Sequence, residues 1–167
     1  MKKLILLLLI SGLFFNCNQK QRYTQNSKEI DTVKSMIEAY NSKDYASAQS
    51  HYADTSKTRF NSDLMDSKEI PNYHQQNDAN YSSRGFLDDG QEYEMVVDDK
   101  GHTWVNFWGD WKGTLKGNGK DVTIHIHLTS RFVDGKIVEE YGYWDPSEVI
   151  ANLQDIAAQN SMQTESE

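Results

Sequence analysis

Two tyrosines and an aspartate alternate within the stretch FVDGKIVEEYGYWDPSEVI, which spans residues 132–150. Because Tyr141, Tyr143 and Asp145 lie two residues apart, their side chains point to the same face of a β-strand. In an apolar pocket, the carboxylate would have a raised pKa, which suits a general base working near neutral pH. On an exposed face, the same three residues would have no such chemistry.

The turn before this strand predicts which face the three residues occupy. Asp134 and Gly135 favour a two-residue type I′ turn, since aspartate tolerates the positive φ angle that this turn requires and glycine prefers it. This register places Phe132 opposite Ile137. Counting by twos then puts the three residues on one face with an aliphatic row, made up of Val122, Ile124, Ile126, Leu128 and Phe132. We therefore expect Tyr141, Tyr143 and Asp145 to face a cavity as catalytic residues, with the two tyrosines also contacting a ligand.

Two alternatives remain open for Asp145. It precedes Pro146, which suits the first position of a helix, so one alternative is that its carboxylate acts as a helix cap and has no further role. A one-residue bulge would instead flip one row of side chains and set His125 beside Asp145 as an acid–base pair.

The preceding strand offers further candidate ligand contacts. Trp104, Asn106, Trp108 and Asp110 alternate on one of its faces. Large rings with an amide between them can line a cavity for an apolar ligand, although core packing or a dimer interface also explains such a row. We expect Trp104 and Trp108 to contact the ligand, together with Phe60 from the short predicted strand KTRFN.

Two histidines raise the question of a metal site. His125 and His127 lie two apart on one predicted strand, a spacing that can serve a metal ion. In the register above they face outward, away from Asp145, and no third ligand is evident. We therefore expect no metal and no cofactor, and an outer sheet face that is exposed or pairs with a second copy in a homodimer.

The elements around these residues indicate an α+β domain. Helical spacing of apolar residues covers 30–40 and 44–53, an irregular helix is expected near Pro71, and another begins at Pro146. Four later segments, separated by turn signals, predict antiparallel strands at 92–98, 102–112, 120–133 and 136–145. Such an order favours helices packed on one face of a sheet.

The chain resembles the SnoaL-like group of the nuclear transport factor 2-like superfamily. The resemblance rests on MIEAYNSKDYASAQSHYADT and, more specifically, on RFVDGKIVEEYGYWDPSEVIANL, and it covers roughly residues 28–155. It implies a cone-shaped barrel, with helices in the concave face of a curved antiparallel sheet around a cavity. Polyketide cyclases and ketosteroid isomerases of this group use buried acids and tyrosines for proton transfer beside a carbonyl. The acid of the cyclases corresponds best to Asp145, whereas the base of the isomerases has no counterpart here.

The N-terminus predicts export to the cell envelope. Lys2 and Lys3 precede an apolar run at residues 4–15, which is too short to span a bilayer, since that needs about 20 residues. Cys17, the only cysteine, follows at the expected cleavage point, and the segment resembles a bacterial lipoprotein signal in which this cysteine is acylated, for example with palmitate. We expect four parts, namely a signal peptide at 1–16, a polar tether at 17–27, the domain at 28–158 and a disordered tail at 159–167.

Composition limits the partners of the domain. The 167 residues are 37% hydrophobic and 11% aromatic, which fits one domain, and the net charge of −8 disfavours nucleic acid. We expect a lipid-anchored domain of the bacterial envelope, facing the periplasm or the surface, that binds a small, largely apolar molecule. An isomerase- or cyclase-type enzyme with Asp145 as base, and a structural or protein-binding lipoprotein, are the alternatives.

Overall fold

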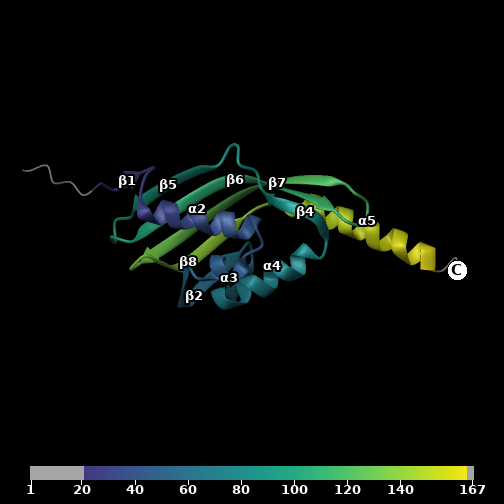
Figure 1. The fold of residues 1–167 in the computed structure, drawn as a ribbon, viewed down its shortest axis with the longest axis horizontal. Coiled ribbons are helices and arrows are strands. Elements are labelled where there is room, and N and C mark those ends of the chain that lie inside the picture. The colour runs from purple at the N-terminus through teal and green to yellow at the C-terminus, as the bar shows by residue number, and fades with distance from the viewer. Residues whose placement is uncertain (1–20, 165–167) are drawn as a thin grey trace, which may run out of the picture.

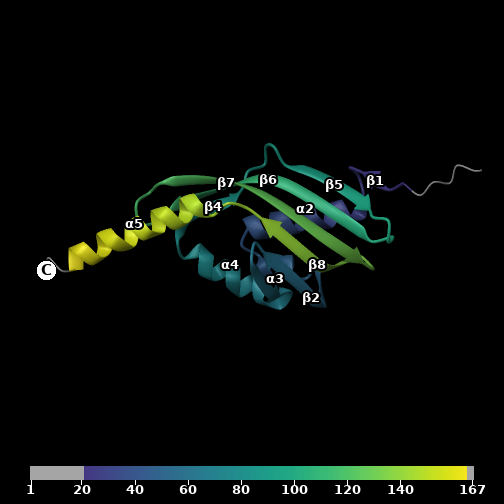
Figure 2. The same ribbon diagram turned by 180° about the vertical axis from the view of Figure 1, so that it is seen from behind.

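A computed structural model describes residues 21–164 as a curved sheet with helices on its concave side (Figures 1 and 2). The helices are α2 (Lys28–Asn41), α3 (Tyr45–Gln49), the 3₁₀ segment η2 (Ser67–Glu69), α4 (Ile70–Asp78) and α5 (Ser147–Thr164). The strands are β1 (Tyr23–Thr24), β2 (Tyr52–Phe60), β3 (Asp63–Asp66), β4 (Tyr81–Phe86), β5 (Glu92–Val97), β6 (Thr103–Leu115), β7 (Asp121–Val133) and β8 (Lys136–Tyr143).

The sheet confirms the predicted α+β class. Its strands follow the order β1-β5-β6-β7-β8-β2-β3, and β4 pairs with β6 beyond the end of β5. The predicted meander of four antiparallel strands is β5 to β8. One pairing differs from the prediction, because β2 runs parallel to β8 and makes the sheet mixed. The strand predicted at KTRFN is the second half of β2.

Local capping signals start the first two helices. The Ser27 hydroxyl accepts the backbone N–H of Ile30 at 3.2 Å at the start of α2, and Asp44 caps α3 through the N–H of Ser47. The apolar stripe of α2 then packs on the concave face of the sheet, which buries Ile30, Val33, Met36, Ile37 and Ala39. These caps and this stripe place α2 against the inner sheet face.

The hairpin between β7 and β8 begins as predicted. Asp134 and Gly135 both have positive φ, of 51° and 75°, and Phe132 pairs with Ile137. The register then shifts, because Arg131 pairs with Glu139 and leaves Val138 as the extra residue of a bulge. Beyond the bulge every side chain of β8 lies on the face opposite to the predicted one. The aliphatic row of β7 does face inward.

The helix α5 extends away from the body of the molecule (Figure 1). It continues through Thr164, into the segment predicted to be a disordered tail, because no glycine or proline interrupts it. None of the helices within residues 21–164 is long and apolar enough to cross a membrane. Cys17 and the predicted signal peptide lie outside the described residues.

Candidate functional site

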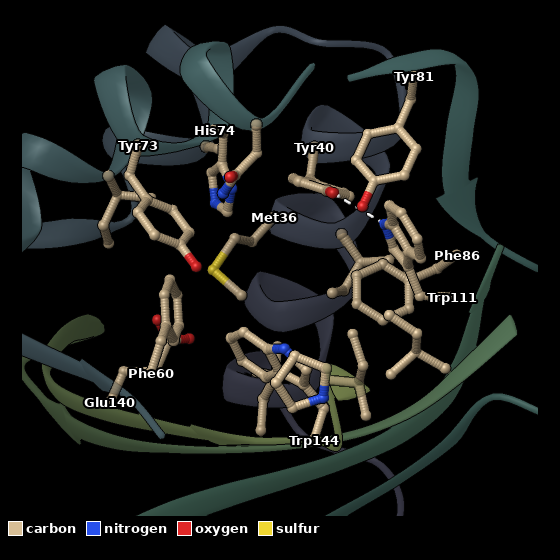
Figure 3. Close-up of a pocket in the computed structure, with 18 of the residues that line it drawn as sticks. Met36, Tyr40, Phe60, Tyr73, His74, Tyr81, Phe86, Trp111, Glu140 and Trp144 are labelled. Atoms are coloured by element: carbon tan, nitrogen blue, oxygen red, sulfur yellow. Dashed lines mark hydrogen bonds between the residues drawn. The ribbon is translucent and has the colours of Figure 1, made fainter. Parts of the chain in front are cut away.

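A cavity of about 230 Å³ lies between the concave sheet face and the helices α2, α3 and α4 (Figure 3). Its wall is rich in aromatic side chains and comes from nine elements and the segment after β8. The aromatic lining side chains are Tyr40, Tyr52, Phe60, Tyr73, His74, Tyr81, Phe86, Trp111 and Trp144. The volume is somewhat below the ~300 Å³ of ordinary ligand pockets, which suits a ligand with few heavy atoms.

Of the predicted ligand contacts, Phe60 lines this cavity. Tyr141 and Tyr143 do not, because the bulge turns them to the convex face, where Tyr141 donates to Glu139 at 2.6 Å and Tyr143 is 48% exposed. Asp145 is also exposed, and its carboxylate accepts the N–H of Ser147 at 2.9 Å. The prediction that these three residues face a buried cavity is therefore wrong. Asp145 instead caps the start of α5, which is the first of the two alternatives considered for it.

Trp104 and Trp108 also lie on the convex face, contrary to prediction. Val105 and Phe107 occupy the inner face of β6 and are almost fully buried, so the alternating tryptophans must point outward. Trp108 stacks on His127 with ring centroids 4.8 Å apart, and Trp104 donates to Asp98. These contacts are made outside the cavity.

The two histidines of β7 lie on the convex face as predicted. His125 pairs with Asp110 across the neighbouring strand, and the flipped strand β8 does not bring it beside Asp145. Within residues 21–164 no group of three or more His, Cys, Asp or Glu side chains could hold a metal ion.

The cavity contains a carboxyl group that the sequence analysis missed. Glu140 follows the bulge, is 1% exposed and lines the cavity at the lower wall in Figure 3. Its Oε2 accepts the Tyr52 hydroxyl at 2.6 Å, and its Oε1 accepts the Ser130 hydroxyl at 3.2 Å. Burial raises the pKa of Glu140 to about 7, although hydrogen bonds from Tyr52, Ser130 and Thr58 oppose the shift.

A signal for this arrangement is present in the sequence. Arg131 and Glu139 form an ion pair of 2.8 Å on the convex face, where they lie directly opposite each other. Opposite charges favour such cross-strand positions. A register that pairs Arg131 with Glu139 requires one extra residue after Ile137, and that residue turns Glu140 inward.

The helix α4 contributes a second titratable group, which the sequence analysis also missed. His74 lies against Tyr40 at 4.8 Å and stacks with Tyr45 at 5.6 Å. Burial, with a smaller contribution from Arg84, lowers the pKa of His74 to about 4. Its imidazole is therefore neutral at pH 7.

An arginine holds the helical wall of the cavity in place. The side chain of Arg84, on β4, is 1% exposed and donates to Asp78 on α4 at 2.6 Å and to the carbonyl of Tyr40 on α2 at 2.6 Å. It also donates to the hydroxyl of Tyr45 on α3 and lies 4.0 Å from the centre of the Tyr40 ring. Burial raises the pKa of Asp78, but hydrogen bonds from Arg84 and Tyr45 outweigh this and lower it overall.

Taken together, these groups give the cavity a defined chemistry. Its aromatic wall favours apolar or aromatic atoms, and its carboxyl group can give or accept a proton near neutral pH. The hydroxyls of Tyr73 and Tyr81 add polar groups that can orient a ligand.

The sequence matches no protein-family model and no curated protein. Solved structures do match. A SnoaL-like protein of Shewanella denitrificans OS-217, named as a candidate polyketide cyclase, aligns with a TM-score of 0.60 at 17% identity, covering 78% of this chain and 99% of the other. A second candidate polyketide cyclase, from Xanthomonas campestris pv. campestris, aligns with a TM-score of 0.63 at 17% identity, with coverage of 77% and 98%.

A third match is a protein of Catenulispora acidiphila DSM 44928 in complex with trimethylamine, described as having a ketosteroid isomerase-like fold. It aligns with a TM-score of 0.59 at 14% identity, and the alignment covers 72% of this chain and 90% of the other. The chain has the ketosteroid isomerase-like fold. This fold agrees with the predicted curved sheet around helices and a cavity. At 14–17% identity, the three similarities show the architecture alone.

Proposed function

We propose that this domain binds a small, largely apolar molecule in the aromatic cavity. The observation that carries the proposal is the cavity of about 230 Å³ whose aromatic wall encloses one carboxyl group, Glu140. Pockets of this composition hold ligands by apolar contact and use a few polar groups for orientation. The trimethylamine complex of the similar Catenulispora protein and the candidate cyclases of the same fold support a small-molecule role.

A variant with a smaller cavity tests this proposal. Ala48 lines the cavity from the buried side of α3, so Ala48→Leu is expected to fill part of the space and weaken ligand binding at least tenfold. Native mass spectrometry of the purified protein should detect a retained ligand in the parent and lose it in the variant. Thermal shifts with a panel of small apolar compounds should follow the same order.

Ala46→Leu is the matched control, because Ala46 is exposed on the same helix. It is expected to leave binding unchanged. Equal binding by the parent and Ala48→Leu, or the absence of both a retained ligand and any binding compound, would contradict the proposal.

The pKa of Glu140 supports enzymatic activity of the isomerase or cyclase type as a second candidate function. A carboxyl group whose pKa is about 7 can abstract a proton from carbon next to a carbonyl near neutral pH. The hydroxyls of Tyr73 and Tyr81 line the same cavity and can donate to the enolate oxygen that forms. Solvent deuterium exchange into a bound ketone, lost in Glu140→Gln, would support this function, and exchange that persists in the variant would exclude Glu140 as the base.

The N-terminal sequence supports a membrane tether for this domain. We propose that a lipid on Cys17 anchors it to the bacterial cell envelope, with the domain facing the periplasm or the surface. In a bacterial host, Cys17→Ser is expected to move the protein from the membrane fraction to the soluble fraction and to abolish labelling by a fatty acid. A variant that stays with the membrane and keeps the label would refute lipidation.

Detergent-solubilised parent protein should sediment as a homodimer if the convex sheet face pairs with a second copy, and as a monomer if it does not.

A further inference from the structure

We infer that the preferred ligand of this cavity is an alkylated ammonium ion, held among the aromatic rings and balanced by the Glu140 carboxylate. This inference rests on the proposed ligand-binding function and specifies the class of ligand. It is carried by two features of the site: an aromatic enclosure and a buried carboxyl group that has no cationic partner.

The aromatic enclosure suits a diffuse cation. Rings from α2, β2, α4, β4, β6 and the segment after β8 surround the cavity in Figure 3, and they include two indoles, Trp111 and Trp144. The face of an aromatic ring attracts a cation, and indole does so most strongly. An alkylated ammonium ion also presents methyl or methylene groups to the wall, so it gains apolar contact and cation–π attraction at the same atoms.

The carboxyl group of Glu140 faces only uncharged groups of the protein. It accepts hydrogen bonds from Tyr52 of β2 and Ser130 of β7, and a hydrogen bond from Thr58 of β2 also lowers its pKa. The Tyr52 hydroxyl also lies 3.1 Å from the sulfur of Met36 on α2. The neighbouring Arg131 is not available, because it pairs with Glu139 on the convex face. An ionised Glu140 therefore lacks a counter-charge, and a cationic ligand would supply it.

The other titratable groups around the cavity add no competing net charge. His74 is neutral at pH 7, and the hydroxyls of Tyr40, Tyr73 and Tyr81 have pKa values raised by burial. Arg84 stacks on the Tyr40 ring at the helical wall. Its charge is balanced by Asp78 at 2.6 Å, and the charge of Lys43, 3.8 Å from the same carboxylate, is screened by solvent because that side chain is 49% exposed. The charge that a ligand experiences is therefore governed by Glu140.

This arrangement couples ligand binding to a proton. Without ligand, the pKa of Glu140 is about 7, so the carboxyl group is mainly protonated at pH 6 and mainly ionised at pH 8. A quaternary ammonium ion carries no titrating proton and favours the ionised carboxylate. Its affinity should therefore rise about tenfold from pH 6 to pH 8, and binding near pH 7 should release a proton.

The test compares choline and tetramethylammonium with 3,3-dimethyl-1-butanol, the neutral isostere of choline, by isothermal titration calorimetry at pH 6 and pH 8. We expect choline to bind at least tenfold more tightly than the isostere at pH 8. Titrations at pH 7 in buffers of different ionisation enthalpy should detect the released proton. In Glu140→Gln, the pH dependence and the preference for the cation should both disappear, while the isostere binds as in the parent.

Glu139→Gln is the matched control, because it removes the same charge from the adjacent residue on the convex face, and it should behave as the parent. Equal or tighter binding of the neutral isostere, a pH dependence that survives in Glu140→Gln, or no binding of either ammonium ion would overturn the inference. If the isostere binds at least as tightly as choline and Ala48→Leu abolishes that binding, the proposed function stands while the inference falls. If neither class binds and no ligand is retained, both fall.

Discussion

Replacing Arg84 with methionine is expected to lower the free energy of unfolding by about 3–5 kcal/mol. The guanidinium group is almost fully buried and supplies hydrogen bonds to three elements, through Asp78, the carbonyl of Tyr40 and the hydroxyl of Tyr45. Methionine fills similar space but donates nothing, so a carboxylate that is 17% exposed loses the nearer of its two counter-charges and keeps only Lys43, at 3.8 Å. Urea denaturation, followed by tryptophan fluorescence, measures the loss.

Arg131→Met is the matched control. It breaks an ion pair of similar geometry with Glu139 on the convex face, where the two side chains are 25% and 32% exposed. Pairs of that exposure contribute about 1 kcal/mol or less. The double variant Arg84→Met with Asp78→Asn should recover part of the lost stability, because it removes the unpaired charge. If Arg84→Met costs no more than Arg131→Met, Arg84 does not hold the helical wall.

Replacing Glu140 with glutamine is expected to change how stability depends on pH. The pKa of Glu140 is about 7 in the folded protein and 4.5 as the ordinary value. Between these values the folded state keeps a proton that the unfolded state has lost, so the contribution of Glu140 makes stability fall as pH rises. The shift corresponds to roughly 3 kcal/mol. The stability of Glu140→Gln relative to the parent should therefore rise by about that amount between pH 4 and pH 8.

His74 gives the opposite control for the sign of this effect. Its pKa is lowered from 6.5 to about 4, so between these values the unfolded state carries a proton that the folded state lacks, and stability rises with pH. The stability of His74→Gln relative to the parent should therefore fall between pH 4 and pH 7. Parallel curves for the parent and Glu140→Gln would show that the folded protein does not keep this carboxyl group protonated.

The parts of the fold that follow from neighbouring residues could be predicted. The positive φ angles of Asp134 and Gly135 set the last hairpin, and Ser27 and Asp44 cap the first two helices. The inward row of β7 follows from the period of a strand. Each of these features depends on residues close together in the sequence, which is why the order of elements and the α+β class were predicted. The curvature of the sheet was implied by the family resemblance.

The site could not be predicted, because it depends on the packing of distant segments. The strand β8 pairs with β2 on its other edge, and that pairing also loses register, between Tyr52 and Lys57. Gly142 faces inward where a Cβ would lie 2.8 Å from the Phe60 ring, so only glycine fits between the inward-facing Glu140 and Trp144. The alternation of the tyrosines along the strand does not contain this constraint. It predicted that Asp145, and not Glu140, supplies the carboxyl group of the cavity.

The α4 wall of the cavity was missed for a similar reason. The segment SKEIPNYHQQND is polar and has no clear apolar stripe, so its sequence gave little reason to expect Tyr73 and His74 at a ligand site. Both are held there by the ion pair of Asp78 and Arg84, whose partners come from separate elements. Tertiary contacts therefore decide which of the polar residues in α4 face inward.

The bulge at Val138 has a consequence for how chains of this fold diverge. Deleting a single codon there would restore the unbroken alternation and exchange the two faces of the strand from that point onward. Glu139, Tyr141 and Tyr143 would then line the interior, and Glu140 and Trp144 would meet solvent. Two homologous proteins that differ by this one deletion can thus share almost every residue of the strand and still have different side chains facing the ligand cavity.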